Sequence, residues 1–125
     1  MARWLSAAAV AAATLVGGCG GGLYLTLGPA DNPPNVSLAA SPATAARGET
    51  IGLIAAASDD YRVVEVAFFR VDAGGDTLLG RDSSAPYALT TVIPAGASGA
   101  VSYFARATDD AGQVGESRTV TVAVH

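Results

Sequence analysis

The chain has 125 residues, a formal net charge of −4 at pH 7 and an apolar fraction of 50%. That length holds one domain, and eleven acidic residues against seven arginines argue against nucleic acid as a partner. One histidine, His125, and one cysteine, Cys19, with no lysine, leave no material for a nucleophile–base pair. The composition therefore predicts that the protein is not an enzyme.

Residues 1–18 have the layout of a secretory signal. Arg3 supplies the positive charge, Leu5–Val16 is an apolar run rich in alanine, and Gly17 and Gly18 are the small residues before a cleavage point. An uncleaved membrane helix would need about 20 apolar residues. Glycines at 17, 18 and 20–22 interrupt the run before that length, so we expect the segment to be removed.

The tetrapeptide Val16-Gly17-Gly18-Cys19 resembles the lipobox of bacterial lipoproteins. The resemblance implies cleavage before Cys19, acylation of its thiol and attachment to a membrane of the bacterial cell envelope. Two or three acyl chains, as such lipoproteins carry, hold firmly where one chain binds only marginally. Gly20 after the cysteine is similar to lipoproteins sorted to an outer membrane, and whether the protein faces the periplasm or the exterior stays open. The alternative is an incidental thiol at the end of a cleaved signal.

Residues 19–33 are predicted to be the lipidated cysteine and a flexible tether. Glycines 20–22, Gly28-Pro29 and the segment Asp31–Pro34 argue against a helix. The short segment Leu23–Leu27 alternates like a strand. The sequence does not decide whether it packs on the domain or lies at the bilayer.

Residues 34–125 are predicted to form an all-β domain, an antiparallel sandwich of about seven strands, because short alternating segments recur between turn signals. Helix-period stretches are absent outside the signal. The expected strands are Val36–Ala40, Thr50–Ala57, Arg62–Val71, Thr77–Arg81, Tyr87–Ile93, Val101–Thr108 and Ser117–Val124. In the second of these, alternation places one set of side chains on the buried face: Ile51, Leu53, Ala55 and Ala57.

The third expected strand changes its pattern along its length. Val64, Val66 and Phe68 are predicted to point inward, and Phe69 and Val71 are out of phase with them. A β-bulge at this point would explain the slip. The next segment, Thr77–Arg81, is expected to be a short strand D of the sandwich.

Several phrases of the sequence resemble the immunoglobulin-like domains of bacterial exported and surface proteins. They are Pro33-Pro34-x-Val36-x-Leu38, Val66-x-Phe68, Leu78-Leu79-Gly80 with Ala85-Pro86-Tyr87, and Ala105–Gly112. The resemblance spans Pro33–Val124 and implies an immunoglobulin-like sandwich used for spacing, adhesion or recognition. The disulfide and core tryptophan of antibody domains are absent.

Within that framework three residues are expected to have structural roles. Phe68 takes the place of the core tryptophan. Tyr103 is placed as a tyrosine corner, with its ring buried and its hydroxyl bonded to backbone. Gly112 is expected to supply the positive φ of the turn after the sixth strand, where Asp109 accepts a hydrogen bond from the backbone two residues on.

Two acidic pairs are candidates for a calcium site. Asp59-Asp60 and Asp109-Asp110 follow the second and sixth expected strands, whose loops lie at the same pole of an immunoglobulin-like sandwich. Calcium takes six to eight oxygen ligands, and the start of the domain brings Asp31 and Asn35 towards the same pole. The alternative is that each aspartate caps its own turn, since no ordered ligand spacing is visible. Apart from calcium, no cofactor is expected.

Phe69 and Phe104 are predicted to point outward from adjacent strands. An exposed aromatic pair is a candidate recognition patch. The alternative is cross-strand packing or cover by the tether.

The sequence predicts a membrane-anchored envelope lipoprotein whose domain is a non-catalytic binding or adhesion module. The alternative is a structural accessory subunit that docks on a larger envelope or surface assembly. An envelope protein and a surface glycan both stay open as partners, as does the oligomeric state.

Overall fold

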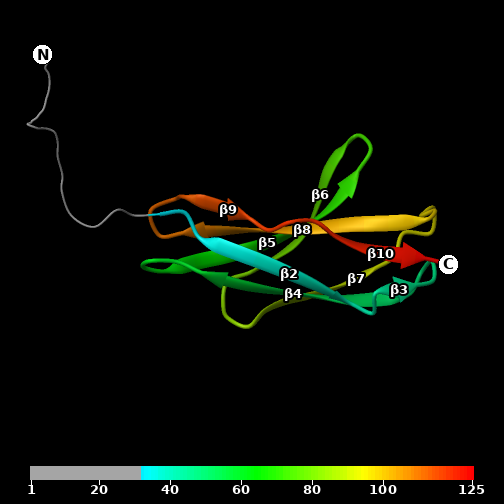
Figure 1. Cartoon of the computed structure of the whole chain (residues 1–125), viewed down its shortest axis with the longest axis horizontal. Helices are drawn as coiled ribbons and strands as arrows, with labels where there is room; N and C mark the ends of the chain where they lie inside the picture. Colours follow the sequence, from blue (N-terminus) through cyan, green and yellow to red (C-terminus); the bar gives the residue numbers. More distant parts are fainter. Residues whose placement is uncertain (1–31) are drawn as a thin grey trace, which may run out of the picture. The chain divides into compact units, whose positions relative to one another are not determined.

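The computed structural model describes residues 32–125, in which every regular element is a β-strand (Figure 1). The predicted signal, Cys19 and the segment Leu23–Leu27 lie outside the described residues. Between residues 32 and 125 no helix is long and apolar enough to cross a membrane. The strands are β2 (Asn35–Ser41), β3 (Thr44–Ala45), β4 (Thr50–Ser58), β5 (Val63–Asp72), β6 (Gly75–Asp82), β7 (Tyr87–Val92), β8 (Ala100–Asp109), β9 (Val114–Glu116) and β10 (Val120–Val124).

The strands form two sheets, as expected for an immunoglobulin-like sandwich. The small sheet has the order β2-β4-β7, and all its pairs are antiparallel. The large sheet has the order β3-β10-β8-β5-β6, with β9 also pairing with β8. The fold is therefore all-β, as the alternating segments predicted.

Alternation is regular in the small sheet. In β4 the side chains of Ile51, Leu53 and Ala55 are buried, and the intervening residues face outward. β2 and β7 show the same two-residue period. Because one face of the sheet covers the core, this period fixes the register of all three strands.

The pairing shifts at the predicted point, but the extra residue lies on the neighbouring strand, so the predicted change of phase within β5 is wrong. The pairing of β5 with β6 shifts between Phe68 and Phe69, because β6 carries Leu79 as an additional residue at this point. Side chains along β5 keep alternating, so Phe69 remains on the outer face. Leu79 instead packs against the core.

Two details of β5 and β6 differ from prediction. Val64 is 36% exposed rather than inward, because the pairing of β5 with β8 shifts between Val63 and Glu65 and leaves Val64 as the extra residue. β6 pairs with β5 in the large sheet, and not beside β7 as a strand D would. Neither difference is visible in the alternation of a single strand.

The last strand is divided, and one short strand was not predicted. Residues 117–119 separate β9 from β10, where a single strand Ser117–Val124 was expected. The two-residue strand β3 pairs in parallel with β10. Strand β3 carries the chain from the small sheet to the large one, within a segment whose sequence indicates a loop.

The core lies between the sheets and is built from aliphatic, alanine and three large aromatic side chains. Fully buried members come from both sheets and from the segments that join them. They include Ala45, Ile51, Leu53, Val66, Phe68, Ile93, Tyr103, Ala105, Ala107 and Val122, with Tyr87 at the margin.

Gly115 gives a direct test of how closely the sheets approach. A Cβ atom added there would lie far inside the contact distance of the Pro34 carbonyl oxygen. Backbone cannot move away as a flexible side chain can, so we expect Gly115→Ala to lower the free energy of unfolding by about 1–3 kcal/mol. Urea unfolding measures the change.

Gly74→Ala is the matched control for Gly115→Ala. A Cβ atom at Gly74 would meet nothing within 4 Å, so the control is expected to stay within about 0.5 kcal/mol of the parent. Equal stability of the two variants would contradict the close approach of β2 and β9.

Candidate functional site

The residues with predicted structural roles lie in the core. Phe68 and Tyr103 are fully buried, as expected. The hydroxyl of Tyr103 has no hydrogen-bond partner among residues 32–125, so the predicted bond of a tyrosine corner is wrong. Burial raises the pKa of the Tyr103 phenol because the charged phenolate would lose its hydration.

Asp109 organises the turn between β8 and β9. Its carboxylate accepts hydrogen bonds from the backbone N–H of Ala111, at 3.0 Å, and of Gln113, at 2.7 Å. Gly112 has a φ of +83°, which confirms its predicted role. Asp109 is only 2% exposed, and its second carboxylate oxygen has no partner in the described chain. A turn-capping role therefore accounts for one of its two oxygens.

The second acidic pair lies at the same pole. The backbone N–H of Asp110 donates to the carbonyl of Arg62, at 3.1 Å, so the β8–β9 and β4–β5 connections meet. Asp59 accepts from Tyr61 N–H at 3.2 Å, and Asp60 accepts from Asn32 N–H at 3.0 Å. The first described residue of the chain thus lies at this pole, as the topology predicted.

The four aspartates do not form a shared ligand set. Within residues 32–125, no three Asp, Glu, His or Cys side chains come close enough to hold a metal ion together. One oxygen each of Asp59, Asp109 and Gln113 is nevertheless buried without a hydrogen-bond partner in this part of the chain. Calcium binding by Asp59, Asp60, Asp109 and Asp110 stays a prediction.

The aromatic pair is on the outer face of the large sheet, and it is packed across the strands. The rings of Phe69 and Phe104 stack with centroids 4.9 Å apart and planes 8° from parallel. The guanidinium carbon of Arg106 lies 4.7 Å from the Phe69 centroid, and Arg106 is held by Glu116. Phe104 is consequently buried to 7% exposure. The arrangement favours cross-strand packing over an open aromatic platform.

A polar cluster lies at the opposite pole, where β5 ends. Arg70 donates to Asp72 through two nitrogens, at 2.8 and 3.2 Å, and Thr77 also donates to this carboxylate. These hydrogen bonds hold the pKa of Asp72 below its usual value. The cluster borders a hollow of about 430 Å³ beside the β7–β8 connection. The charges of Arg70 and Asp72 neutralise each other, which is the pattern of a structural ion pair.

The outer face of the small sheet is the feature that sequence reasoning missed. None of its outward residues is charged or aromatic, although β5, β6 and β8 all carry charges. In strand order these residues are Asn35, Ser37, Ala39 and Ser41 of β2, Thr50, Gly52, Ile54, Ala56 and Ser58 of β4, and Ala88, Thr90 and Val92 of β7. We call this surface the neutral face.

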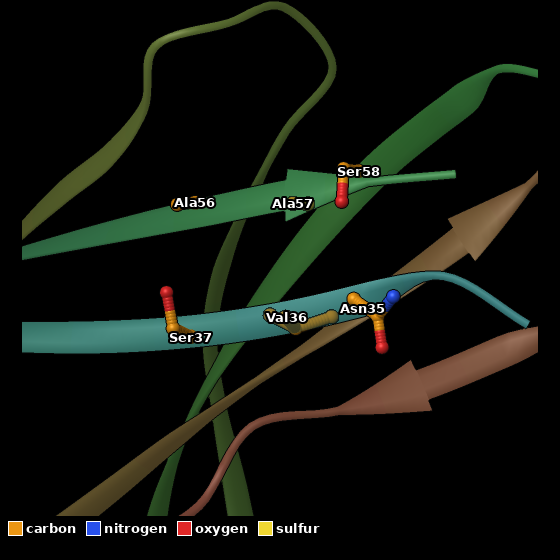
Figure 2. A pocket seen from close by; sticks show the side chains of 6 residues that line it. All are labelled: Asn35, Val36, Ser37, Ala56, Ala57 and Ser58. Carbon is orange, nitrogen blue, oxygen red and sulfur yellow. The ribbon is translucent and has the colours of Figure 1, made fainter. Parts of the chain in front are cut away.

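The neutral face contains two open hollows. One, of about 300 Å³, lies over the first half of β2 and the end of β4, with Asn35, Ser37 and Ser58 at its rim. Figure 2 shows the hydroxyls of Ser37 and Ser58 directed towards the space between these two strands. The other, of about 330 Å³, lies beside the exposed side chain of Ile54. The neutral face therefore offers hydroxyl groups and a little apolar surface without any fixed charge.

Comparison with known proteins agrees with this architecture. The sequence model of a family described as "Bacterial Ig domain" matches residues 34–122. The chain belongs to the bacterial Ig domain family. The match covers nearly all the described residues, and it does not reach residues 1–33. No protein of curated function matches the chain.

Three solved structures are similar to part of this bacterial Ig domain chain. The fibronectin(III)-like modules of Clostridium thermocellum CbhA are 29% identical, with a TM-score of 0.57, over 72% of this chain and 94% of theirs. Pectate lyase Pel3 from Pectobacterium carotovorum is 15% identical, with a TM-score of 0.49, over 74% of this chain and 27% of that enzyme. CopC from Methylosinus trichosporium OB3b is 21% identical, with a TM-score of 0.42, over 72% of this chain and 93% of CopC.

Substitutions of Asp109 test whether this residue caps the turn or binds a metal ion. Asp109→Ala removes both backbone acceptor bonds, so we expect it to lower the free energy of unfolding by about 1–3 kcal/mol. Asp109→Asn keeps an acceptor oxygen and removes a buried charge, so we expect the parental stability or higher. Urea unfolding in chelator and in calcium measures both, with Asp110→Ala as an exposed control. A calcium-dependent gain in the parent that Asp109→Asn abolishes would contradict this expectation and identify Asp109 as a ligand.

Proposed function

We propose that this bacterial Ig domain is the non-catalytic binding module of an envelope lipoprotein. Residues 1–18 are the export signal, Cys19 carries the lipid, and residues 19–33 tether the domain to the membrane, which is an outer membrane where the cell has one. The domain then contacts another component of the envelope or of the surface. The lipobox-like residues Val16–Cys19 support the anchor, and the neutral face supports the contact.

The neutral face is the surface on which the proposed binding role is based. Burying a charge in an interface costs free energy unless it is paired, and the centres of protein interfaces are depleted of charged residues. The neutral face can meet another surface without that cost. Its exposed apolar side chains, Ile54 at 58% and Val92 at 51% exposure, add a favourable term on burial.

A structural accessory subunit is the second candidate function. Strands with a free edge are natural docking sites for another chain, and β2 and β7 are the edges of the small sheet. A fixed stoichiometry with one envelope protein distinguishes this role from adhesion, in which the protein would bind glycan or another external ligand from the cell surface.

Cys19→Ser tests the anchor. We expect the parent to fractionate with membranes and to incorporate a labelled fatty acid, and Cys19→Ser to lose both, because the chain has no other cysteine to acylate. Membrane fractionation and metabolic labelling in a bacterial host measure the change. A labelled Cys19→Ser protein, or an unlabelled parent, would contradict lipidation.

Ile54→Glu tests the neutral face. A charge at the centre of this surface would be buried in any contact made there, so we expect about a tenfold weaker yield of cross-linked partner from intact cells or, without a protein partner, of cell-surface ligand binding. Val71→Glu is the control, because Val71 is also exposed, at 39%, but lies on the large sheet. Both variants should melt as the parent does. Equal losses in the two variants would contradict a role for the neutral face.

A further inference from the structure

Among residues 32–125, one edge of the small sheet has no neighbouring strand. β2 pairs with β4 on one side, and within the described chain no strand pairs with its other side. In an antiparallel strand about half of the backbone N–H and C=O groups point away from a single partner. Alternate residues of the seven-residue strand Asn35–Ser41 therefore present unused backbone donors and acceptors along this edge.

A groove runs beside this open edge. It has a volume of about 400 Å³ and is lined by Val36, Ser37 and Leu38 of β2 on one side and by residues 118–120 on the other. Arg118 and Thr119 lie in the interruption between β9 and β10, and Val120 is the first residue of β10. Figure 1 shows β9 and β10 running alongside β2. The groove thus lies between the free edge of one sheet and an unpaired stretch that leads into the other.

The lining of the groove combines three aliphatic side chains, the hydroxyl residues Ser37 and Thr119, and one cation. Val36, Leu38 and Val120 are partly buried and pack against the core, so they form its apolar floor. Arg118 is exposed, and its guanidinium forms no ion pair with any residue between 32 and 125. Arg70, Arg81 and Arg106 all have carboxylate partners. Arg118 is therefore a free positive charge at an open strand edge, in a chain with a net charge of −4.

We propose that this groove binds an extended acidic segment of a partner protein, which adds to the free edge of β2 as a further strand. Main-chain hydrogen bonds to β2 supply affinity, and alternate side chains of the segment contact the apolar floor. A carboxylate of the segment pairs with Arg118, which selects an acidic segment over a basic one. The inference deepens the proposed function, because it names the kind of partner that the binding module takes.

The residues that line the groove indicate which kind of molecule binds there. A free strand edge requires a ligand with its own backbone donors and acceptors, which a glycan does not offer in a strand-like repeat. Arg118, the one cation that lines the groove, favours an acidic group on that ligand. A second copy of this chain would bring a strand edge, but neither edge strand of the small sheet, β2 or β7, carries a carboxylate to pair with Arg118.

A pair of peptides tests the proposal in solution, without the anchor. The probes are short peptides of alternating valine and threonine with one central glutamate or, in the twin, one central lysine. Because residues 32–125 enclose their own core, ¹⁵N-labelled domain can be titrated directly. We expect the glutamate peptide to shift the amide resonances of Val36–Leu38 and Arg118–Val120, and to bind about tenfold more tightly than the lysine peptide.

Three controls make the outcome decisive. Arg118→Glu should reverse the preference between the peptides, whereas Arg62→Glu, an equal change of net charge in the β4–β5 connection, should leave it unchanged. A glutamate peptide N-methylated at alternate residues should lose binding, because it cannot pair with β2. Equal binding of the two peptides, shifts located elsewhere, or no binding would overturn the proposal.

Self-association is distinguished in the same experiment. Shifts of these amides on diluting the protein without peptide would show that a second copy occupies the edge, which also overturns the proposal. Loss of lipidation in Cys19→Ser does not affect the peptide titration, so failure of the anchor and failure of the groove are separate results.

Discussion

The close approach of two sheets at small residues is the constraint on which this domain depends. The described residues contain no cysteine, so no disulfide holds the sheets together. Buried alanines at 55, 105 and 107 leave room for Phe68 and Tyr103, and Gly80 and Gly115 stand where side chains would strike Leu89 or Pro34. Stability therefore comes from tight packing around few large side chains, in which a single added methyl group is felt.

That packing also determines what the two outer faces can do. On the large sheet, the stacked Phe69 and Phe104 are covered by Arg106, and the arginine is in turn paired with Glu116. The groups of this network therefore pair with one another and leave little for a ligand to contact. On the small sheet no such network exists, because none of its outward residues is charged or aromatic. The surfaces left for a partner are thus the neutral face and the open edge of β2 beside Arg118.

The poles show the same division between satisfied and unsatisfied groups. Arg70, Asp72 and Thr77 bond to one another at the end of β5. At the pole where the described chain begins, Asp109 caps its turn and still retains a buried oxygen without a partner. The immunoglobulin-like topology predicted that the loops of Asp59 and Asp109 share a pole. Which oxygens of these carboxylates are bonded depends on the individual turns, which no spacing along the chain reveals.

The sequence by itself determined the sandwich, the inward residues of β4 and the turn at Asp109 and Gly112. All of these follow from local rules: a two-residue period, turn chemistry and glycine's freedom at positive φ. Only the tertiary structure decided that β6 joins the large sheet, that Val64 is squeezed outward, and that the Tyr103 hydroxyl is left without a partner. It also decided that β2 keeps an open edge next to Arg118. Each of these depends on which strand lies beside which, and pairing across long stretches of chain is a property of the whole core rather than of any segment.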